Sequence, residues 1–334
     1  MLPGAAANTS VYVYAYRREA SGIVASHMST APTSSRFIAY LLLTASMALV
    51  GTYVGLSKPL VAVIPVFALA FLRFAIASIA MLPWTFRAKG EAPLTRTEQW
   101  LFFLLSFFGN FLFSICMLSG IALTTATAAG VTLATLPAVV ALLSRWFLHE
   151  TLTLRTWIAI VLAVVGIALL QLAKTAEPLP EPGSTLTALL GNLLLFGAVV
   201  CEAIYVIIAK RLSATRSPLR VSALINLLGL VLIAPLGLWQ LASFDASALS
   251  ANLWLLLIFY SLAASLFAVW MWVAGLKHVA ASHAGVFTVA LPISATLVGI
   301  FLLGETFTWL QAAALACAAA GIFLISSARH TTLP

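Results

Sequence analysis

Long apolar stretches separated by short polar segments run through the whole chain. Ten of them contain about 20 mostly apolar residues each, which is the length that a helix needs to cross a bilayer. The pattern therefore predicts an all-α membrane protein with ten transmembrane helices. The predicted spans are residues 37–56, 64–84, 99–119, 123–147, 156–173, 186–208, 220–241, 252–274, 280–303 and 309–327.

The second half of the chain repeats the first. Residues 120–170 align without a gap on residues 275–325, at an offset of 155, with 17 identities in 51 positions. A second register, offset by 152, places Tyr53 on Tyr205. Each repeat holds five predicted spans, an odd number, so the second repeat enters the membrane from the opposite side. The sequence thus predicts two inverted five-helix repeats, the arrangement in which secondary transporters place a midplane site.

The amino-acid composition is that of a membrane protein and not of a soluble one. Hydrophobic residues make up 63% of the sequence and charged residues 8%, whereas soluble domains carry about 25% charged residues. The net charge of +8 is therefore assigned to the membrane surface and not to nucleic acid. The three cysteines lie within apolar runs, so we interpret them as small buried hydrophobes and not as a disulfide or metal set.

Charge and tryptophan positions predict the orientation. With the N-terminus inside, 14 Lys and Arg residues fall in inside segments and only Lys58 and Lys174 fall outside. Positive residues collect on the cytoplasmic side, so both termini are expected in the cytoplasm of a bacterial-type inner (plasma) membrane. Six tryptophans lie near span ends, as in an aromatic belt: Trp84, Trp100, Trp146, Trp239, Trp254 and Trp309.

The chain divides into four parts. Residues 1–35 are rich in Ala, Ser and Thr and have no sustained periodicity, so we expect a disordered tail, with Met28 as an alternative translation start. The first repeat covers 36–173, a proline-bearing linker covers 174–185, and the second repeat covers 186–327.

A set of motifs occurs once in each repeat. A span with a central proline leads into LHETLT (148–153) or LGETFT (303–308), and a span with a glycine near its end follows. Lys58 and Lys210 close the first span of each repeat. Over residues 37–327 the chain resembles the EamA domains of the drug/metabolite transporter superfamily. The resemblance implies a ten-helix secondary transporter with a central cavity. It also implies export of amino acids and related metabolites, often driven by protons.

Glu202 is the only acidic residue well inside a predicted span. A charged carboxylate facing lipid near the midplane costs several kcal/mol, so Glu202 must face the bundle interior, be protonated or be paired. We expect a proton-coupling or amine-binding group, with a structural acid paired to Arg73 as the alternative. Tyr205 follows three residues later on the same helix face and is assigned to the same site.

Four further residues are assigned to the substrate or proton pathway. Tyr53 repeats as Tyr205, so the pair is expected to line one cavity from two sides. Asn110 lies within a span, with an interhelical hydrogen bond as its alternative role. Trp270 is placed to stack on a ring-bearing substrate or to pack, and His283 to gate the cytoplasmic end or to be solvated.

Two prolines interrupt equivalent spans. Pro137 and Pro292 each remove a helical N–H and are expected to free the carbonyls of Leu133 and Thr288. In a transporter such interruptions act as hinges or line the cavity. A static kink is the alternative.

Three residues are assigned structural roles. Glu150 and Glu305 occupy the turns after the proline-bearing spans and are expected to lock those turns, beside threonines that cap the next helix. Arg73 is expected to bond to backbone carbonyls, with the binding of a substrate carboxylate as the alternative.

The expected function is secondary active transport across the inner membrane. The chain lacks a Walker A loop and a HExxH motif, so we expect no enzymatic activity, no cofactor and no metal site. Export of amino acids or related small organic metabolites, coupled to protons, is the leading hypothesis. An importer, exchanger or uncoupled facilitator on the same fold is the alternative. A non-transporting membrane sensor or scaffold is the alternative of another class.

Overall fold

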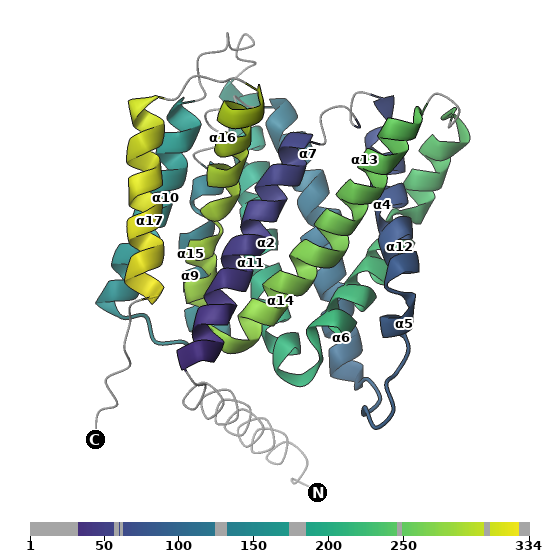
Figure 1. Ribbon diagram of the computed structural model, residues 1–334, viewed down its shortest axis with the longest axis horizontal. Helices are drawn as coiled ribbons and strands as arrows, with labels where there is room; N and C mark the ends of the chain where they lie inside the picture. The colour runs from purple at the N-terminus through teal and green to yellow at the C-terminus, as the bar shows by residue number, and fades with distance from the viewer. Residues whose placement is uncertain are drawn as a thin grey trace, which may run out of the picture.

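The computed structural model describes residues 33–56, 60, 63–123, 132–173, 185–245, 249–303 and 308–326. Within these residues every regular element is a helix, and helical residues occur in each of the ten predicted ranges (Figure 1). Almost all of the predicted tail and linker lies outside the described residues, as do Lys58, Lys174 and Glu305.

Each repeat contains a matching series of helices. The first comprises α2 (Thr33–Leu56), α4 (Val66–Ala80), α5 (Leu82–Thr85), α6 (Arg96–Ser106), η1 (Phe107–Leu112), α7 (Phe113–Leu123), α9 (Leu136–Phe147) and α10 (Leu154–Ala173). The second comprises α11 (Thr185–Thr215), α12 (Pro218–Ala242), α13 (Ala251–Ser261), η3 (Leu262–Phe267), α14 (Ala268–His278), α15 (Ala281–Phe287), α16 (Ala290–Leu303) and α17 (Trp309–Ser326).

The length and apolar character of the described helices confirm a multi-pass membrane protein. Six helical stretches are long and apolar enough to cross a bilayer: Ser35–Tyr53, Arg96–Met117, Leu189–Thr215, Pro218–Ala242, Ala251–His278 and Trp309–Ser326. Four more apolar helices are shorter: Val66–Ala80, Leu136–Phe147, Leu154–Leu170 and Ala281–Ser294. The count of ten spans stays a prediction.

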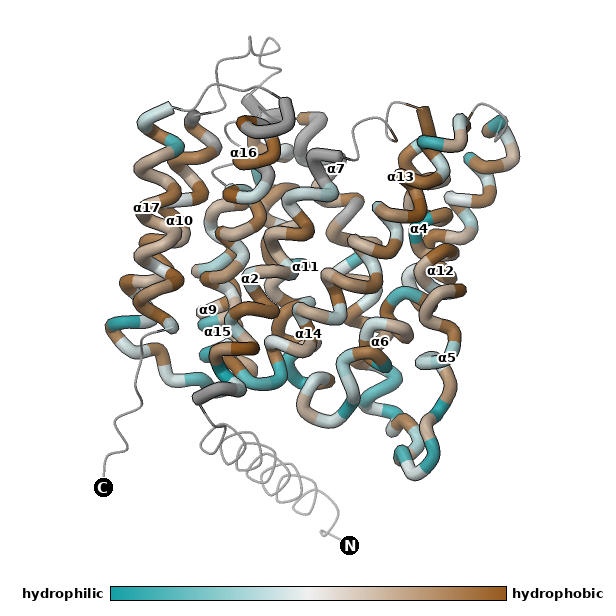
Figure 2. The backbone as a smooth tube through the Cα atoms, viewed as in Figure 1, coloured by the Kyte–Doolittle hydropathy of each residue, from teal (hydrophilic) through white to brown (hydrophobic). Residues whose placement is uncertain are grey.

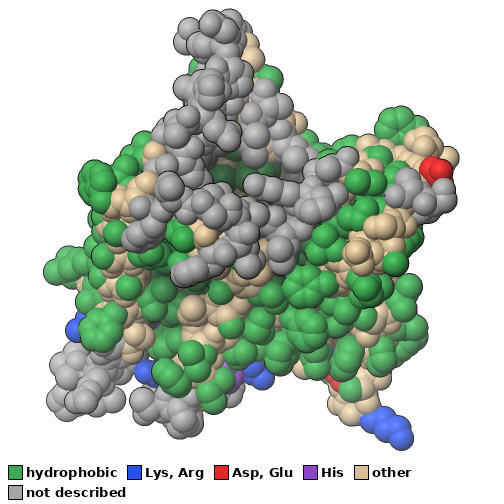
Figure 3. Space-filling model, turned by 45° about the horizontal axis from the view of Figure 1, so that its top comes forward, with side chains coloured by type: hydrophobic (Ala, Val, Ile, Leu, Met, Phe, Trp, Pro, Cys, Tyr) green, Lys and Arg blue, Asp and Glu red, His purple; other side chains and the backbone are tan. Residues whose placement is uncertain are grey.

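Large apolar side chains cover the described outer surface of the bundle, whereas polar residues gather at the helix ends (Figures 2 and 3). Such a surface suits lipid tails at mid-height and headgroups at either end. The six tryptophans predicted near span ends all have exposed side chains, from 37% for Trp254 to 76% for Trp309. Their positions agree with the predicted aromatic belt.

The two repeats pack on each other through reciprocal contacts. Helices α10 and α17 lie antiparallel and side by side (Figure 1). A Cβ atom at Gly166 would lie 3.1 Å from the carbonyl oxygen of Ala314, and one at Gly321 would lie 3.2 Å from that of Ala159. Gly166 and Gly321 are equivalent at offset 155, as are Ala159 and Ala314. The interface is therefore the same from either half, as a two-fold relation requires.

A second pair of contacts follows the same symmetry. A Cβ atom at Gly120 on α7 would lie 2.7 Å from Cγ of Leu195 on α11. A Cβ atom at Gly275 on α14 would lie 2.7 Å from Cγ of Leu43 on α2. The glycines correspond at offset 155 and the leucines at offset 152. The first helix of each half thus packs on the third span of the other half.

Two π-helical turns, which the sequence did not predict, also repeat. The turn η1 (Phe107–Leu112) interrupts the third span and η3 (Leu262–Phe267) interrupts the eighth, 155 residues later. A π turn inserts an extra residue into an α-helix and often marks a functional site. The two π turns therefore indicate a functional site near the middle of the third and eighth spans.

The proline-bearing spans are broken, as expected. Helix α9 begins at Leu136, directly before Pro137, and a turn at residues 288–289 separates α15 from α16 just before Pro292. One expectation was wrong in detail, because the carbonyl of Thr288 is not left open by Pro292. It accepts a hydrogen bond from the amide of Leu291 at 3.1 Å. The backbone thus satisfies itself by a local turn.

One end of the bundle collects basic side chains. We call it the basic face and define it by the start of α2, residues 86–95, and the turns that follow α9, α11 and α14. These segments lie together at the lower edge in Figure 1, and Lys and Arg side chains appear along the lower edge in Figure 3. Lys58 and Lys174, predicted for the opposite side, lie outside the described residues, so the predicted charge asymmetry stays a prediction.

The reciprocal glycine contacts generate a symmetric prediction. Gly166→Val and Gly321→Val each add a branched side chain where even a Cβ atom is crowded, so each should destabilise the protein by about 1–3 kcal/mol. Thermal unfolding in detergent measures the effect. Gly197→Ala is the control, since its Cβ would meet only Cys116 Sγ at an ordinary 3.6 Å. A large loss for one of the two valine variants and none for the other would contradict the two-fold interface.

Candidate functional site

Glu202 lies halfway along α11, on the side of the helix that faces the bundle. Ala198 and Val206, one turn before and after it, are fully buried, whereas Glu202 keeps part of its surface accessible. Glu202 therefore lies on the helix face that packs against the bundle. Its role in a pathway stays a prediction.

Two tyrosines accompany this acid from opposite halves. Glu202 lies within electrostatic range of both Tyr53 on α2 and Tyr205 on α11. The ring of Tyr53 meets that of Tyr260 edge to face, with centroids 5.4 Å apart. The two tyrosines thus approach the same acid from opposite halves, and the expectation that they line one cavity stays a prediction.

Each tyrosine packs against a π turn of the other half. The ring of Tyr205 occupies the space that a Cβ atom at Gly109 in η1 would need. Tyr53 packs in one buried cluster with Ala263 and Ala264 in η3. Gly109 and Ala264 are equivalent at offset 155, so the two tyrosine contacts are again reciprocal. Glu202, the tyrosines and the π turns define the acidic centre of the bundle.

Asn110 lies in η1 next to Gly109 and belongs to the acidic centre. Trp270 is half-buried on α14, and its role stays a prediction. His283 lies elsewhere, because its Nε2 is 3.4 Å from the hydroxyl of Thr156 at the basic face. The structure thus brings Glu202, Tyr53 and Tyr205 within electrostatic range of one another. Their assignment to a pathway stays a prediction.

Arg73 reaches the edge of the acidic centre. Its guanidinium lies 4.4 Å above the ring of Phe74 and acts electrostatically on Tyr53. Among the described residues no salt bridge joins it to Glu202, so the pairing considered from the sequence is not found. Its Nε atom is buried and has no hydrogen-bond partner within the protein. A donor left in this state is available to an anionic group of a ligand.

At the basic face, Glu150 joins the two halves. It follows α9 in the first repeat, but its carboxylate binds the start of α15 in the second. Its oxygens accept from the amides of Ala281 at 2.7 Å and Ser282 at 3.0 Å, and from the hydroxyl of Ser282 at 2.6 Å. A carboxylate at a helix N-terminus satisfies exposed amides and complements the helix dipole. The predicted structural role agrees, but the partner is α15 and not the turn of Glu150 itself.

Lys210 binds the backbone on the other side of the turn between α14 and α15. It is 94% buried, and its Nζ donates to the carbonyls of Leu276 at 2.6 Å and Val279 at 2.7 Å at the end of α14. A cation at a helix C-terminus is favourable because it meets unpaired carbonyls. The turn between α14 and α15 is therefore fixed by one cation before it and one anion after it. The first-repeat threonine that follows Glu150, Thr153, caps α10 as expected.

A second charged contact between the halves at the basic face surrounds Arg216, which follows α11. Its guanidinium donates to both carboxylate oxygens of Glu98 at 2.8 and 2.6 Å and to Glu91 at 3.0 Å. It also donates to the carbonyls of Ala92 and Pro93. Forked binding of this kind is the strongest that arginine offers to carboxylates.

The ionisation of this network favours its charged form. The hydrogen bonds that Arg216 donates to Glu98 raise the pKa of Arg216 above its ordinary value, although burial acts against it. Burial raises the pKa of Glu91, but the amide of Ala88 and the Arg216 guanidinium outweigh it and leave that pKa below its ordinary value. Near neutral pH the network is therefore charged, and it ties residues 91–98 of the first repeat to the second.

Comparison with known proteins gives a consistent match. Residues 37–172 and 189–327 each match the EamA-like transporter family. The uncharacterized transporter YetK of Bacillus subtilis is 36% identical over 287 residues, which are 86% of this chain and 86% of YetK. An uncharacterized transporter of Archaeoglobus fulgidus is 25% identical over 77% of this chain and 87% of its own. A chain of known crystal structure superposes with a TM-score of 0.71 at 19% identity, covering 86% of this chain and 98% of that one, and shows the fold alone.

The Glu150 cap generates a prediction about stability at the basic face. Glu150→Ala removes three charge-assisted hydrogen bonds, so the start of α15 should exchange its amide hydrogens faster and the protein should lose about 2 kcal/mol of stability. Hydrogen exchange of residues 281–284 and thermal unfolding measure both effects. Arg155→Ala, an exposed cation after the same turn, is the control and should change neither. Unaltered exchange in Glu150→Ala would show that the cap does not hold the two halves.

Proposed function

The chain belongs to the EamA-like transporter family, and we propose on that premise that it is a proton-coupled exporter of amino acids or related small organic metabolites. One observation carries the proposal: an acidic residue, Glu202, lies in an otherwise apolar helix, within electrostatic range of the two tyrosines that pack on the π turns. Polar groups inside a membrane bundle are costly, so one that persists there marks a substrate or ion pathway.

The proposed topology has ten spans in a bacterial-type inner membrane, with both termini in the cytoplasm. The gathering of Lys and Arg at the basic face supports this orientation, because positive residues are retained on the cytoplasmic side. The first described residues of α2 and the last of α17 lie at this same end (Figure 1). An even number of spans requires that outcome.

The proposed transport cycle is alternating access by the two inverted halves. Glu150, Lys210 and Arg216 all join elements at the basic face, and those of Glu150 and Arg216 cross from one half to the other. These contacts support a state that is closed toward the cytoplasm. Opening toward the cytoplasm would then require the cross-repeat bonds of Glu150 and Arg216 to break. The breaks before Pro137 and Pro292 are proposed as the hinges, since a turn absorbs rotation more easily than a continuous helix.

The acidic centre suits a small molecule that carries both charges. The carboxylate of Glu202 is proposed to bind the ammonium group of the substrate or, in its absence, a proton. The guanidinium of Arg73 is proposed to bind the substrate carboxylate, because its Nε donor is buried without a protein partner. The phenols of Tyr53 and Tyr205, both within electrostatic range of Glu202, are proposed to donate hydrogen bonds to the same ligand. Competition between proton and substrate for Glu202 would couple their movements.

The alternatives differ in direction and coupling. An importer, an exchanger or an uncoupled facilitator would use the same fold. A non-transporting sensor or scaffold would use the fold as well, but the partly accessible acid would then have no role. Transport of any solute that depends on Glu202 rejects that last alternative.

The proposed topology predicts which residues react from outside the cell. In a variant without cysteines, a cysteine at Lys89 should react with an impermeant maleimide only after the membrane is opened. A cysteine at Ser184 should react in intact cells. The two positions lie in the only two long polar segments between the predicted spans. Reaction of the Lys89 cysteine in intact cells would reverse the orientation.

The proposed coupling predicts the phenotype of Glu202→Gln. The amide keeps the size of the side chain but cannot carry the proton, so accumulation driven by a pH gradient should fall to background in proteoliposomes, while passive substrate exchange persists. Asp245→Asn, an exposed acid after α12, is the control and should keep gradient-driven flux. Concentrative transport by Glu202→Gln would remove Glu202 from the coupling and make His283 the next candidate.

A further inference from the structure

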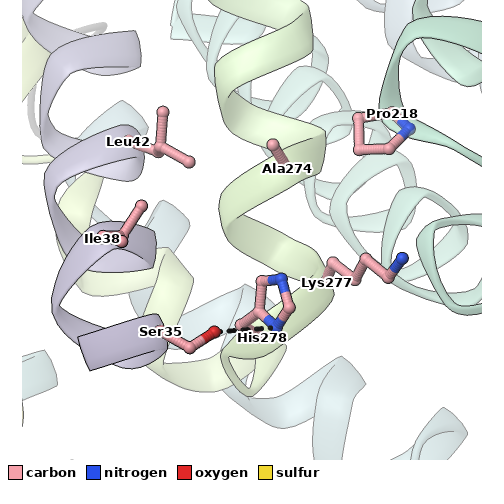
Figure 4. A pocket seen from close by; sticks show the side chains of 7 residues that line it. All are labelled: Ser35, Ile38, Leu42, Pro218, Ala274, Lys277 and His278. Carbon is pink, nitrogen blue, oxygen red and sulfur yellow. Dashed lines mark hydrogen bonds between the residues drawn. The ribbon is translucent and has the colours of Figure 1, made fainter. Parts of the chain in front are cut away.

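A cavity of about 450 Å³ opens at the basic face, between the start of α2 and the end of α14 (Figure 4). Its apolar wall consists of Ile38 and Leu42 from α2 and Ala274 from α14. Ser35, Lys277 and His278 form the polar end, and Pro218 at the start of α12 completes the lining. Neither the transport cycle nor the acidic centre uses this cavity.

The apolar wall belongs to the lipid-facing surface. Ile38 is 55% exposed, and its neighbours Phe37 and Leu41 are 62% and 53% exposed. In a membrane protein such side chains contact acyl chains. The cavity therefore opens sideways into the bilayer and not only toward water.

The polar end carries positive charge from several directions. Lys277 and His278 are exposed cations or potential cations, and Figure 4 shows both side chains at the polar end of the cavity, with Lys277 extending toward α12. None of the described residues that line the cavity is acidic. The N-terminus of α12 adds the positive end of its dipole at Pro218.

Lys210 neutralises the negative end of the α14 dipole next to the cavity. The end of α14 would present carbonyl oxygens, which repel anions, but the buried Nζ of Lys210 already binds those of Leu276 and Val279. The local field at Lys277 and His278 is therefore positive. An apolar groove that ends in positive charge at the membrane surface matches one ligand chemistry, a hydrophobic chain with an anionic headgroup.

We propose that this cavity binds an anionic phospholipid of the cytoplasmic leaflet. The phosphate lies beside Lys277 and His278, the hydroxyl of Ser35 hydrogen bonds to the headgroup, and one acyl chain runs along Ile38, Leu42 and Ala274. The lipid would pack between α2 of the first repeat and α14 of the second. It would thus reinforce the contact between the halves at the basic face. This proposal does not depend on the identity of the transported substrate.

Lipid retention tests the proposal. The full chain is placed in nanodiscs with equal amounts of phosphatidylglycerol and phosphatidylcholine, and native mass spectrometry measures which lipid stays bound. The wild type should retain phosphatidylglycerol in preference. Lys277→Gln with His278→Gln should lower that preference by about fivefold, the contribution expected of one lysine at the membrane surface. A matched double variant, Lys89→Gln with Arg211→Gln, removes two exposed cations of the basic face outside the cavity and should keep the preference.

A second variant distinguishes the contribution of the apolar groove from that of the positive charge. Ile38→Trp fills the groove without altering any charge and should reduce retention of both lipids, while the folded protein remains monodisperse in detergent. An unchanged preference in the Lys277 and His278 variant would overturn the proposal. Displacement of phosphatidylglycerol from the wild type by millimolar inorganic phosphate alone would overturn it too, since the site would then be one for phosphate and not for lipid.

Discussion

The antiparallel packing of α10 on α17 fixes the relation between the two halves of the protein. Each helix offers a glycine to the other's alanine carbonyl, so the backbones approach closely in the same way at both places. Close approach at small residues is the main source of attraction between helices in lipid, where the hydrophobic effect no longer favours association. The reciprocal contacts of α7 with α11 and of α14 with α2 follow from the same two-fold relation.

The residues that break the two-fold symmetry are the ones to which the proposed function is assigned. Glu202 corresponds at offset 152 to Val50, so only one half contributes an acid to the acidic centre, although both contribute a tyrosine. The described contacts at the basic face are polar or charged. Those of Glu150 and Arg216 join the two halves. A symmetric frame with one titratable group at its centre and a charged closure at one end provides what alternating access needs: two similar conformations and a ligand-dependent bias between them.

Much of the fold follows from the sequence because membrane helices satisfy their own backbone and are therefore visible as local apolar runs. The repeat offset, the interruption before Pro137 and Pro292, and the cap at Thr153 could be predicted in this way. The partner of Glu150 could not, because Ala281 lies 131 residues away and only the packing of the two halves brings it close. The role of Lys210 was missed for the same reason. The π turns could not be predicted either, since FFGNFL in η1 and LAASLF in η3 share no identical position although their structures match.

The central claim is that the acidic centre is reached from one side of the membrane at a time and that the basic face closes the other. Accessibility of a cysteine at Asn110, in the π turn η1 of the acidic centre, tests it most directly in an otherwise cysteine-free protein. In proteoliposomes of defined orientation, an impermeant maleimide should reach this cysteine from the face opposite the basic one. With Glu150→Ala and Arg216→Gln added, reaction from the basic face should rise several-fold as reaction from the opposite face falls. Equal reaction from both faces, or no response to loss of the two charged contacts, would contradict the account.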